Sequence, residues 1–217
     1  MIRISLALQV AAIILTLWFP APATWAAIED FSRYPAYEMV TVSPGGTYLA
    51  VTHRNDEHDI LSILQLPSLE VVYSRSFGAY LSLAKVIWAT NERLLLQPAR
   101  RFPARIDYEV PTGEIAAIDV DGGDPELLFG YRAGVGDLGI RTRKKTAVRE
   151  AAEIIDRLPE DPQHVIIQTL GYGVEGKRNE ALLLNIHDGD TRTLARSPIN
   201  NGHFITKKWF GCGSRFK

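Results

Sequence analysis

The sequence has little cysteine and little net charge, and both deficits exclude classes of protein. Its 217 residues contain a single cysteine, so neither a disulfide framework nor a cysteine-rich zinc site can form within the chain. Lys plus Arg number 24 and Asp plus Glu number 25, which leaves a net charge of -1. This balance excludes a polycationic nucleic-acid arm or an acidic disordered tail as the dominant feature.

Long apolar runs are also missing beyond the start of the chain. Residues 4–18 are mostly apolar and would form a helix of about 22 Å, shorter than a bilayer core of about 30 Å. Pro20 and Pro22 end this run, and small residues precede a cleavage position after Ala26. We therefore predict a signal peptide over residues 1–26 and an exported protein, periplasmic or secreted. An uncleaved N-terminal membrane anchor is the alternative.

What is present from residue 40 onward is a pattern of short apolar stretches separated by turn residues. This pattern is typical of β-hairpins. Residues 40–51 form the first predicted hairpin, around the turn Ser43-Pro44-Gly45-Gly46, where proline fixes φ and glycine supplies positive φ. Residues 60–73 form the second, around Pro67-Ser68. We expect the polar residues 52–58 between them to be a loop.

The same order of strands and turns occurs twice more along the chain. The second unit contains strand patterns over residues 86–97 and 114–129. The third starts with a turn at 159–163, followed by strand patterns over 164–168 and 180–194. Each unit therefore contains four strands joined as two hairpins, and such units repeated along a chain are typical of β-propeller blades.

Residues 130–157 interrupt the repeat between the second and third units. Within this insert, apolar residues over 146–158 recur at intervals of three to four, which predicts a short helix. The basic residues 141–145 precede it. We interpret them as a solvated loop, because a nucleic-acid site would combine interleaved aromatic residues with an overall basic charge.

The predicted fold class is all-β. We expect an incomplete β-propeller of about three four-stranded antiparallel blades over residues 27–208, with a short helical insertion near 146–158. Residues 202–205 resemble the first strand of a fourth blade, and 209–217 form an atypical C-terminal tail without a strand-turn pattern. A β-sandwich built from hairpins is the alternative architecture.

Four segments resemble a known family. Residues 28–35, 42–50, 88–95 and 118–123 are similar, in this order, to the N-terminal propeller of secreted bacterial prolyl oligopeptidase-type serine peptidases, which include dipeptidyl and acylaminoacyl peptidases. Blades of that family carry motifs of the form Ser-Pro-Asp-Gly-Lys-x-Leu-Ala, and Gly45 stands here in place of the usual Asp. The resemblance extends from about residue 28 to about residue 208.

The resemblance implies a division of labour in which the propeller filters substrates and a C-terminal α/β-hydrolase domain cleaves peptide bonds. That domain needs a serine in a G-x-S-x-G motif, with a later Asp and His. The sequence contains no G-x-S-x-G motif. The segment Gly211-Cys212-Gly213-Ser214 has its glycines and serine in the wrong order for one. No catalytic residue is therefore predicted, and we expect this chain alone not to be a peptidase.

Three functional hypotheses follow. The first is a non-catalytic propeller fragment of an exported serine peptidase, and we hypothesise a truncated or frame-shifted product of a longer parent. The second is a periplasmic propeller-type module that binds a protein or peptide and has no enzyme parent. The third is a small β-sandwich lipid or envelope protein held by its uncleaved N-terminus.

Histidines and acidic residues provide the candidate metal ligands. Metal binding requires such side chains to converge on one point, and we interpret the group around residues 52–59 as a solvated loop. Its members are His53, Asp56, Glu57, His58 and Asp59. Asp119, Asp121 and Asp124 lack the later Glu of a calcium loop.

The remaining candidates also have structural interpretations. His187 lies in a predicted hairpin turn, where small polar residues serve backbone geometry. Trp88 occupies a strand position typical of the core, and nothing in the tail fixes a base beside Cys212. We predict no catalytic, cofactor-binding or metal site.

The expected partners follow from the same hypotheses. We expect peptides or a partner protein on a propeller face, self-association through open blade edges, no nucleic acid, and no membrane once the signal peptide is removed.

Overall fold

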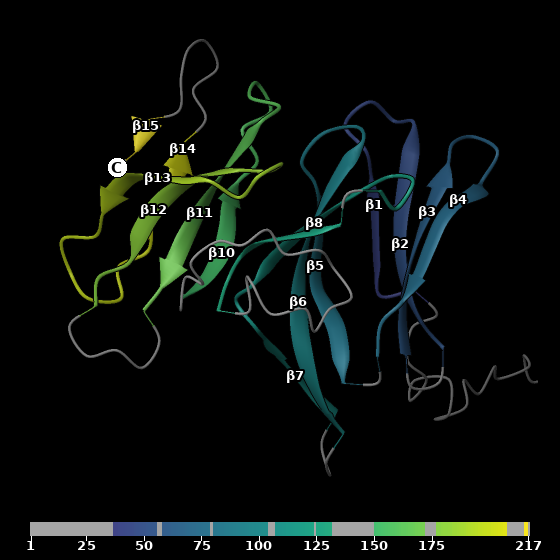
Figure 1. Ribbon diagram of the computed structural model, residues 1–217, viewed down its shortest axis with the longest axis horizontal. Helices are drawn as coiled ribbons and strands as arrows, with labels where there is room; N and C mark the ends of the chain where they lie inside the picture. Colours follow the sequence, from purple (N-terminus) through teal and green to yellow (C-terminus); the bar gives the residue numbers. More distant parts are fainter. Residues whose placement is uncertain are drawn as a thin grey trace, which may run out of the picture. The chain divides into compact units, whose positions relative to one another are not determined.

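Strands make up all the regular structure in the part of the chain that the computed structural model describes. The described residues are 37–55, 58–78, 80–103, 107–123, 125–131, 150–171, 177–207 and 215–216. They contain fifteen strands and no helix (Figure 1). None of these residues belongs to a helix with the length and apolar character needed to cross a bilayer.

The first sheet is a four-stranded antiparallel meander. Its strands pair in chain order and are β1 (Met39–Val42), β2 (Tyr48–Asn55), β3 (His58–Gln65) and β4 (Glu70–Ser76). The turn between β1 and β2 depends on Ser43, whose buried hydroxyl accepts hydrogen bonds from the backbone N–H groups of Thr47 and Tyr48. Gly46 follows with φ of 71°, a conformation in which glycine is favoured.

The second sheet follows the same plan with one addition. Its main path runs β5-β6-β8-β9, and the strands are β5 (Leu81–Trp88), β6 (Arg93–Pro103), β7 (Asp107–Pro111), β8 (Ile115–Asp119) and β9 (Glu126–Phe129). The long β6 pairs with β8 along its first half and with the additional β7 along its second half. The sequence pattern did not predict β7.

The third sheet is again a four-stranded antiparallel meander. Its strands are β10 (Ala151–Asp156), β11 (His164–Leu170), β12 (Glu180–Asn185) and β13 (Thr191–Arg196). Beyond it, β14 (Thr206–Lys207) pairs with β15 (Arg215–Phe216), so a part of the C-terminal tail does enter a ladder. The strand predicted over residues 202–205 begins only at Thr206.

The second sheet is buried on both faces, and its sequence explains why. On β6, Leu94 and Leu96 pack into a core shared with the first sheet, whereas Leu95 packs into a core shared with the third. Successive side chains of a strand point to opposite faces, so burial of both faces requires continuous apolar runs such as 94–96 and 115–118. The outer strand β4 is far more polar, and its Val71 is 60% exposed.

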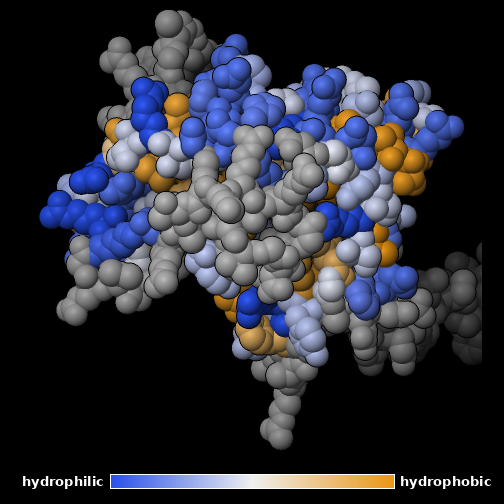
Figure 2. All heavy atoms as spheres, in the orientation of Figure 1, coloured by the Kyte–Doolittle hydropathy of each residue, from blue (hydrophilic) through white to orange (hydrophobic). Residues whose placement is uncertain are grey.

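Three successive meanders, with the middle one buried on both faces, confirm the predicted architecture of three propeller blades. A two-sheet sandwich does not account for them. All the described residues belong to one compact unit. Figure 2 shows apolar groups at the surface on the side where β4 lies.

The predicted helix over 146–158 is wrong over its described part. Residues 151–156 form β10, where Ala152, Ile154 and Asp156 are buried and the residues between them are less so. This alternation has the period of a strand. The apolar spacing of three to four arose because Ile154 and Ile155 lie on opposite faces of the sheet. β10 is the first strand of the third sheet.

The predicted loop over 52–58 is also wrong. β2 continues to Asn55 and β3 starts at His58, in a register that pairs Arg54 with Asp59. Residues 52–55 and His58 thus belong to two paired strands, and Asp59 is 1% exposed.

Candidate functional site

The first strands of all three sheets line one pocket, which we call the inner-strand pocket. It has a volume of about 640 Å³ and is lined by Thr41, Val86, Ile87, Trp88, Ile154, Ile155, Asp156, Arg157 and Thr206. The lining residues of β1, β5 and β10 lie toward the end of each strand. Blades set around a central channel place equivalent strands together in this way.

Trp88 fixes one wall of the inner-strand pocket. Its indole N–H donates to the backbone carbonyl of Thr41 at 3.1 Å, and its ring stacks on Tyr48 with centroids 6.3 Å apart. The side chain is 1% exposed, which confirms its predicted place in the core. The hydrogen bond also holds the first strands of two sheets together.

Two opposite charges lie beside this apolar wall. Asp156 is buried, and its Oδ1 accepts a hydrogen bond from the backbone N–H of Leu158 at 3.0 Å. The next residue, Arg157, is exposed. The pocket therefore offers an apolar surface, a carboxylate, a guanidinium and the hydroxyls of Thr41 and Thr206, a combination suited to a peptide segment.

None of the described residues considered as metal ligands lines this pocket. His53 and His58 are on β2 and β3, and Asp56 and Glu57 fall outside the described residues. Across the described ranges, no three His, Cys, Asp or Glu side chains are grouped as a metal site would require. Cys212 and the basic residues 141–145 also fall outside the described ranges.

Other candidate residues make hydrogen bonds in turns or an ion pair within the fold. His187 donates its backbone N–H to Asn185 Oδ1 at 2.8 Å, and Asp121 accepts from the backbone N–H of Gly123 at 2.8 Å. Asp119 pairs with the buried Arg93. These contacts agree with the structural interpretation of each residue, and Asp124 lies outside the described part of the chain.

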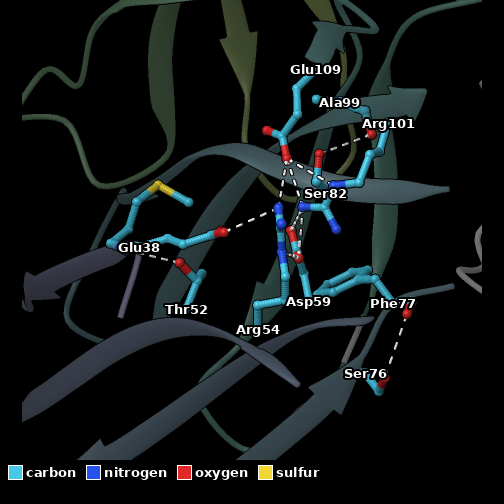
Figure 3. A network of polar contacts seen from close by, with 11 residues as sticks. Glu38, Thr52, Arg54, Asp59, Ser76, Phe77, Ser82, Ala99, Arg101 and Glu109 are labelled. Atoms are coloured by element: carbon cyan, nitrogen blue, oxygen red, sulfur yellow. Dashed lines mark hydrogen bonds and ion pairs between the residues drawn. The ribbon is translucent and has the colours of Figure 1, made fainter. Parts of the chain in front are cut away.

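Asp59 takes part in a cluster of ionised side chains that the sequence did not predict. We call Glu38, Arg54, Asp59, Arg101 and Glu109 the ion cluster; it joins the first sheet to the β6–β7 hairpin (Figure 3). Nη2 of Arg101 lies 2.9 and 3.1 Å from the two oxygens of Asp59 and 2.6 Å from Glu109 Oε1. Nη2 of Arg54 lies 3.3 Å from Glu38 Oε1.

Burial determines the electrostatics of the ion cluster. Desolvation alone would lower the pKa of the Arg101 guanidinium, but hydrogen bonds from its N–H groups to Glu109 and Asp59 outweigh this effect and raise the pKa. Desolvation and the negative charge of Asp59 raise the pKa of the Glu38 carboxyl, against the lowering effect of Arg54. Desolvation is the largest of the effects on the pKa of Glu38, and the excess of three carboxyl groups over two guanidinium groups adds to it.

The raised pKa of Glu38 predicts a pH-dependent stability. Between the ordinary value of 4.5 and the raised value, the folded protein binds more protons than the unfolded chain. The free energy of unfolding contributed by Glu38 therefore falls as the pH rises through this window. We expect the melting temperature of Glu38→Gln to rise relative to that of the native protein as the pH rises above 4.5 and through the raised pKa of Glu38.

Calorimetry of both proteins across this range tests the prediction. Asp161 contributes equally to both: despite desolvation, hydrogen bonds from Gln163 and His164 lower the pKa of its carboxyl. Glu92→Gln, at an exposed turn position, is the control. A difference between Glu38→Gln and the native protein that does not change with pH would contradict the assignment.

No family model and no curated protein matches the sequence. Among solved structures, the chain is similar to the acylaminoacyl peptidase of Pyrococcus horikoshii, with 13% identity and a TM-score of 0.46 over 80% of this chain and 26% of that one. An oligogalacturonate lyase in complex with manganese gives 11% identity and a TM-score of 0.46 over 80% and 46%. Oligopeptidase B from Leishmania major gives 9% and 0.36 over 81% and 30%. The chain thus spans less than half the length of each of these proteins.

Proposed function

We propose that this chain is the non-catalytic, substrate-selecting propeller of an exported serine peptidase, and that it binds a peptide segment in the inner-strand pocket. The observation that carries the proposal is the convergence of the first strands of all three sheets on a pocket with an apolar wall and two opposite charges. The resemblance of the blade motifs to the peptidase propellers supports the choice of ligand.

The chemistry of the pocket suggests how a peptide is held. An apolar side chain of the peptide packs against Ile87, Trp88 and Ile155. Asp156 accepts a hydrogen bond from a backbone N–H or a cationic side chain, and Arg157 donates to a carbonyl or carboxylate. The sequence holds no G-x-S-x-G nucleophile motif, so selection rather than cleavage is the role proposed for this chain.

A peptide-binding assay tests the proposal. The full gene is expressed with its leader, and the protein is purified from the periplasm, where an intact mass beginning at Ala27 would support signal cleavage. Labelled peptides carrying a leucine beside either a lysine or a glutamate are then titrated by fluorescence anisotropy. We expect Ile155→Asp to weaken both peptides about tenfold or more, which corresponds to about 1.4 kcal/mol.

The charged residues provide a sharper readout. Asp156→Asn is expected to weaken the lysine peptide selectively, and Arg157→Gln the glutamate peptide. Glu160→Gln, an exposed neighbour that does not line the pocket, is the matched control. Peptide binding that none of the pocket variants changes, or a failure of all peptides to bind, would rule out the proposal.

A further inference from the structure

Side chains of the third sheet hold the backbone of the segment that leads from this sheet to β14. Residues 202–205 form no ladder. Instead, Asn179 Nδ2 donates to the carbonyl of Gly202 at 3.0 Å, and Gln168 Oε1 accepts from the backbone N–H of Phe204 at 2.6 Å. Thr206 follows directly and lines the inner-strand pocket. We call residues 202–206 the strap.

The strap lies against the face of the third sheet that points away from the second sheet. Val165 and Ile167 on β11 pack in the core shared with the second sheet. Successive side chains of a strand point to opposite faces, so Gln168 belongs to the other face, where the strap contacts it. Gln168 is fully buried. A buried amide needs partners for both its oxygen and its nitrogen, and the strap supplies a partner for each.

The amide of Gln168 determines which form of His203 fits the docked strap. Because Gln168 Oε1 accepts from the N–H of Phe204, its Nε2 faces the imidazole, 2.9 Å from His203 Nδ1. An amide nitrogen only donates, so Nδ1 must offer a lone pair. The docked strap therefore requires a neutral imidazole whose proton is on Nε2. Turning the amide over would place two donors against each other at Phe204 and break that hydrogen bond instead.

The charged groups around His203 do not replace this hydrogen bond when the imidazole gains a proton. On β10, Glu153 Oε1 lies 3.9 Å from His203 Nδ1, which is beyond hydrogen-bond distance. Glu153 already accepts from Gln168 Nε2 at 3.4 Å. The His203 side chain is 69% exposed, and ion pairs at such exposed positions are weak. Two further ion pairs at this end of the sheet are Glu150 with Lys177 and Glu180 with Arg196.

We propose that the strap is a pH-sensitive switch, which docks while His203 is neutral and is released when His203 is protonated, so that Thr206 leaves the wall of the inner-strand pocket. Histidine changes its charge between about pH 5 and about pH 8. Protonation turns Nδ1 into a donor that faces the donor of Gln168, so docking is favoured at the upper end of this range and lost toward the lower end.

The strap has little other support, which makes it sensitive to one hydrogen bond. The side chains of His203 and Ile205 are 69% and 76% exposed, so they add little buried apolar contact. Segments with few buried contacts open locally at a lower free energy than the strands of a core. Release of the strap therefore does not require the third sheet to unfold.

Hydrogen exchange of the full chain tests the switch, because the N–H of Phe204 is protected by Gln168 while the strap is docked. Protection is corrected for the intrinsic exchange rate at each pH. We expect the protection of Phe204 to fall about tenfold from about pH 7.5 to about pH 5.5, as the loss of one hydrogen bond at a buried amide predicts. The N–H of Ile167, on a strand paired on both sides, is the internal reference and should keep its protection.

Three variants assign the change to His203. His203→Asn places an acceptor where Nδ1 lies and does not titrate, so the protection of Phe204 should be the same at both pH values. His203→Lys keeps a positive charge and should leave Phe204 poorly protected at both. His58→Gln removes an exposed histidine of the first sheet and should retain the native change. Equal protection of Phe204 at both pH values in the native protein, or a change that survives in His203→Asn, would overturn the switch.

The consequence for ligand binding rests on the peptide-binding role proposed above. Because Thr206 lines the inner-strand pocket, the native protein should bind the lysine peptide more weakly at about pH 5.5 than at about pH 7.5, whereas His203→Asn should bind it equally at both. A failure of all peptides to bind would rule out the peptide-binding role. The exchange of the Phe204 N–H needs no peptide, so it decides the switch independently.

Discussion

Asp59→Ala is expected to lower the free energy of unfolding by about 3–5 kcal/mol, the range measured when one partner of a buried ion pair is removed. Asp59 is 1% exposed and Arg101 5%, so Nη2 of Arg101 would lose both carboxylate oxygens of Asp59 in a place that water hardly reaches, and would keep its contact with Glu109. Arg54, whose Nε lies 3.5 Å from Asp59 Oδ1, would lose a neighbouring charge as well.

Urea unfolding of three variants separates this effect from a general sensitivity to substitution. The double variant Asp59→Leu/Arg101→Met removes both charges and replaces them with apolar groups, so it should recover most of the loss. Arg196→Met breaks a pair between Arg196, 72% exposed, and Glu180, and should cost about 0–1 kcal/mol. A loss below about 1 kcal/mol for Asp59→Ala would show that the ion cluster does not hold the β6–β7 hairpin to the first sheet.

Gly113→Ala is expected to destabilise the protein by about 2–5 kcal/mol, through two separable causes. The positive φ of 72° costs any residue with a Cβ about 1–2 kcal/mol. The Cβ would also collide with Cβ and Cα of Ala151, at 2.2 and 2.7 Å, and overpacking of this kind costs about 1–3 kcal/mol.

Gly46 provides the matched control for this prediction. Its φ of 71° is nearly the same, yet a Cβ there would meet nothing within 4 Å. Gly46→Ala should therefore show the backbone cost alone, about 1–2 kcal/mol. Combining Gly113→Ala with Ala151→Gly should recover part of the loss. Equal losses at Gly46 and Gly113 in thermal unfolding would argue against a close approach of the second and third sheets.

The repeated four-stranded units could be predicted from the sequence because local chemistry determines them. Ser43, Pro44 and Gly46 specify the first turn, and the continuous apolar runs at 94–96 and 115–118 reflect a sheet that is buried on both faces. These signals lie within a few residues of one another, and the structure confirms the strands they predict.

Features that depend on distant residues could not be predicted in the same way. Asp59 was interpreted as part of a solvated loop because its neighbours are polar, while the partner that buries it, Arg101, lies 42 residues away. The sequence pattern does not predict β7 because this strand is largely exposed and therefore lacks a run of buried apolar residues. Its Tyr108 and Val110 are 49% and 45% exposed. Its pairing with β6 depends on the position where β8 leaves the ladder.

The inner-strand pocket shows the same limit for the candidate site. Ile155, Asp156 and Arg157 follow one another in a segment whose apolar spacing favoured a helix. The other pocket residues Thr41 and Trp88 come from other repeats. The residue spacing within one unit does not predict that residues of different units line the same pocket. The pairing of equivalent positions in successive repeats is the signal that could have located it.

The two hydrophobic cores also determine how a disturbance spreads through the three blades. The second sheet shares one core with the first sheet and another with the third, and Arg93 strengthens the second contact by donating to the carbonyl of Ile186 at 2.8 Å. Such an arrangement resembles a chain of nearest-neighbour couplings. Fraying of the first or the third sheet breaks one of these two interfaces, whereas opening of the second sheet breaks both. Ligands of the first and third blades would therefore influence one another through the second.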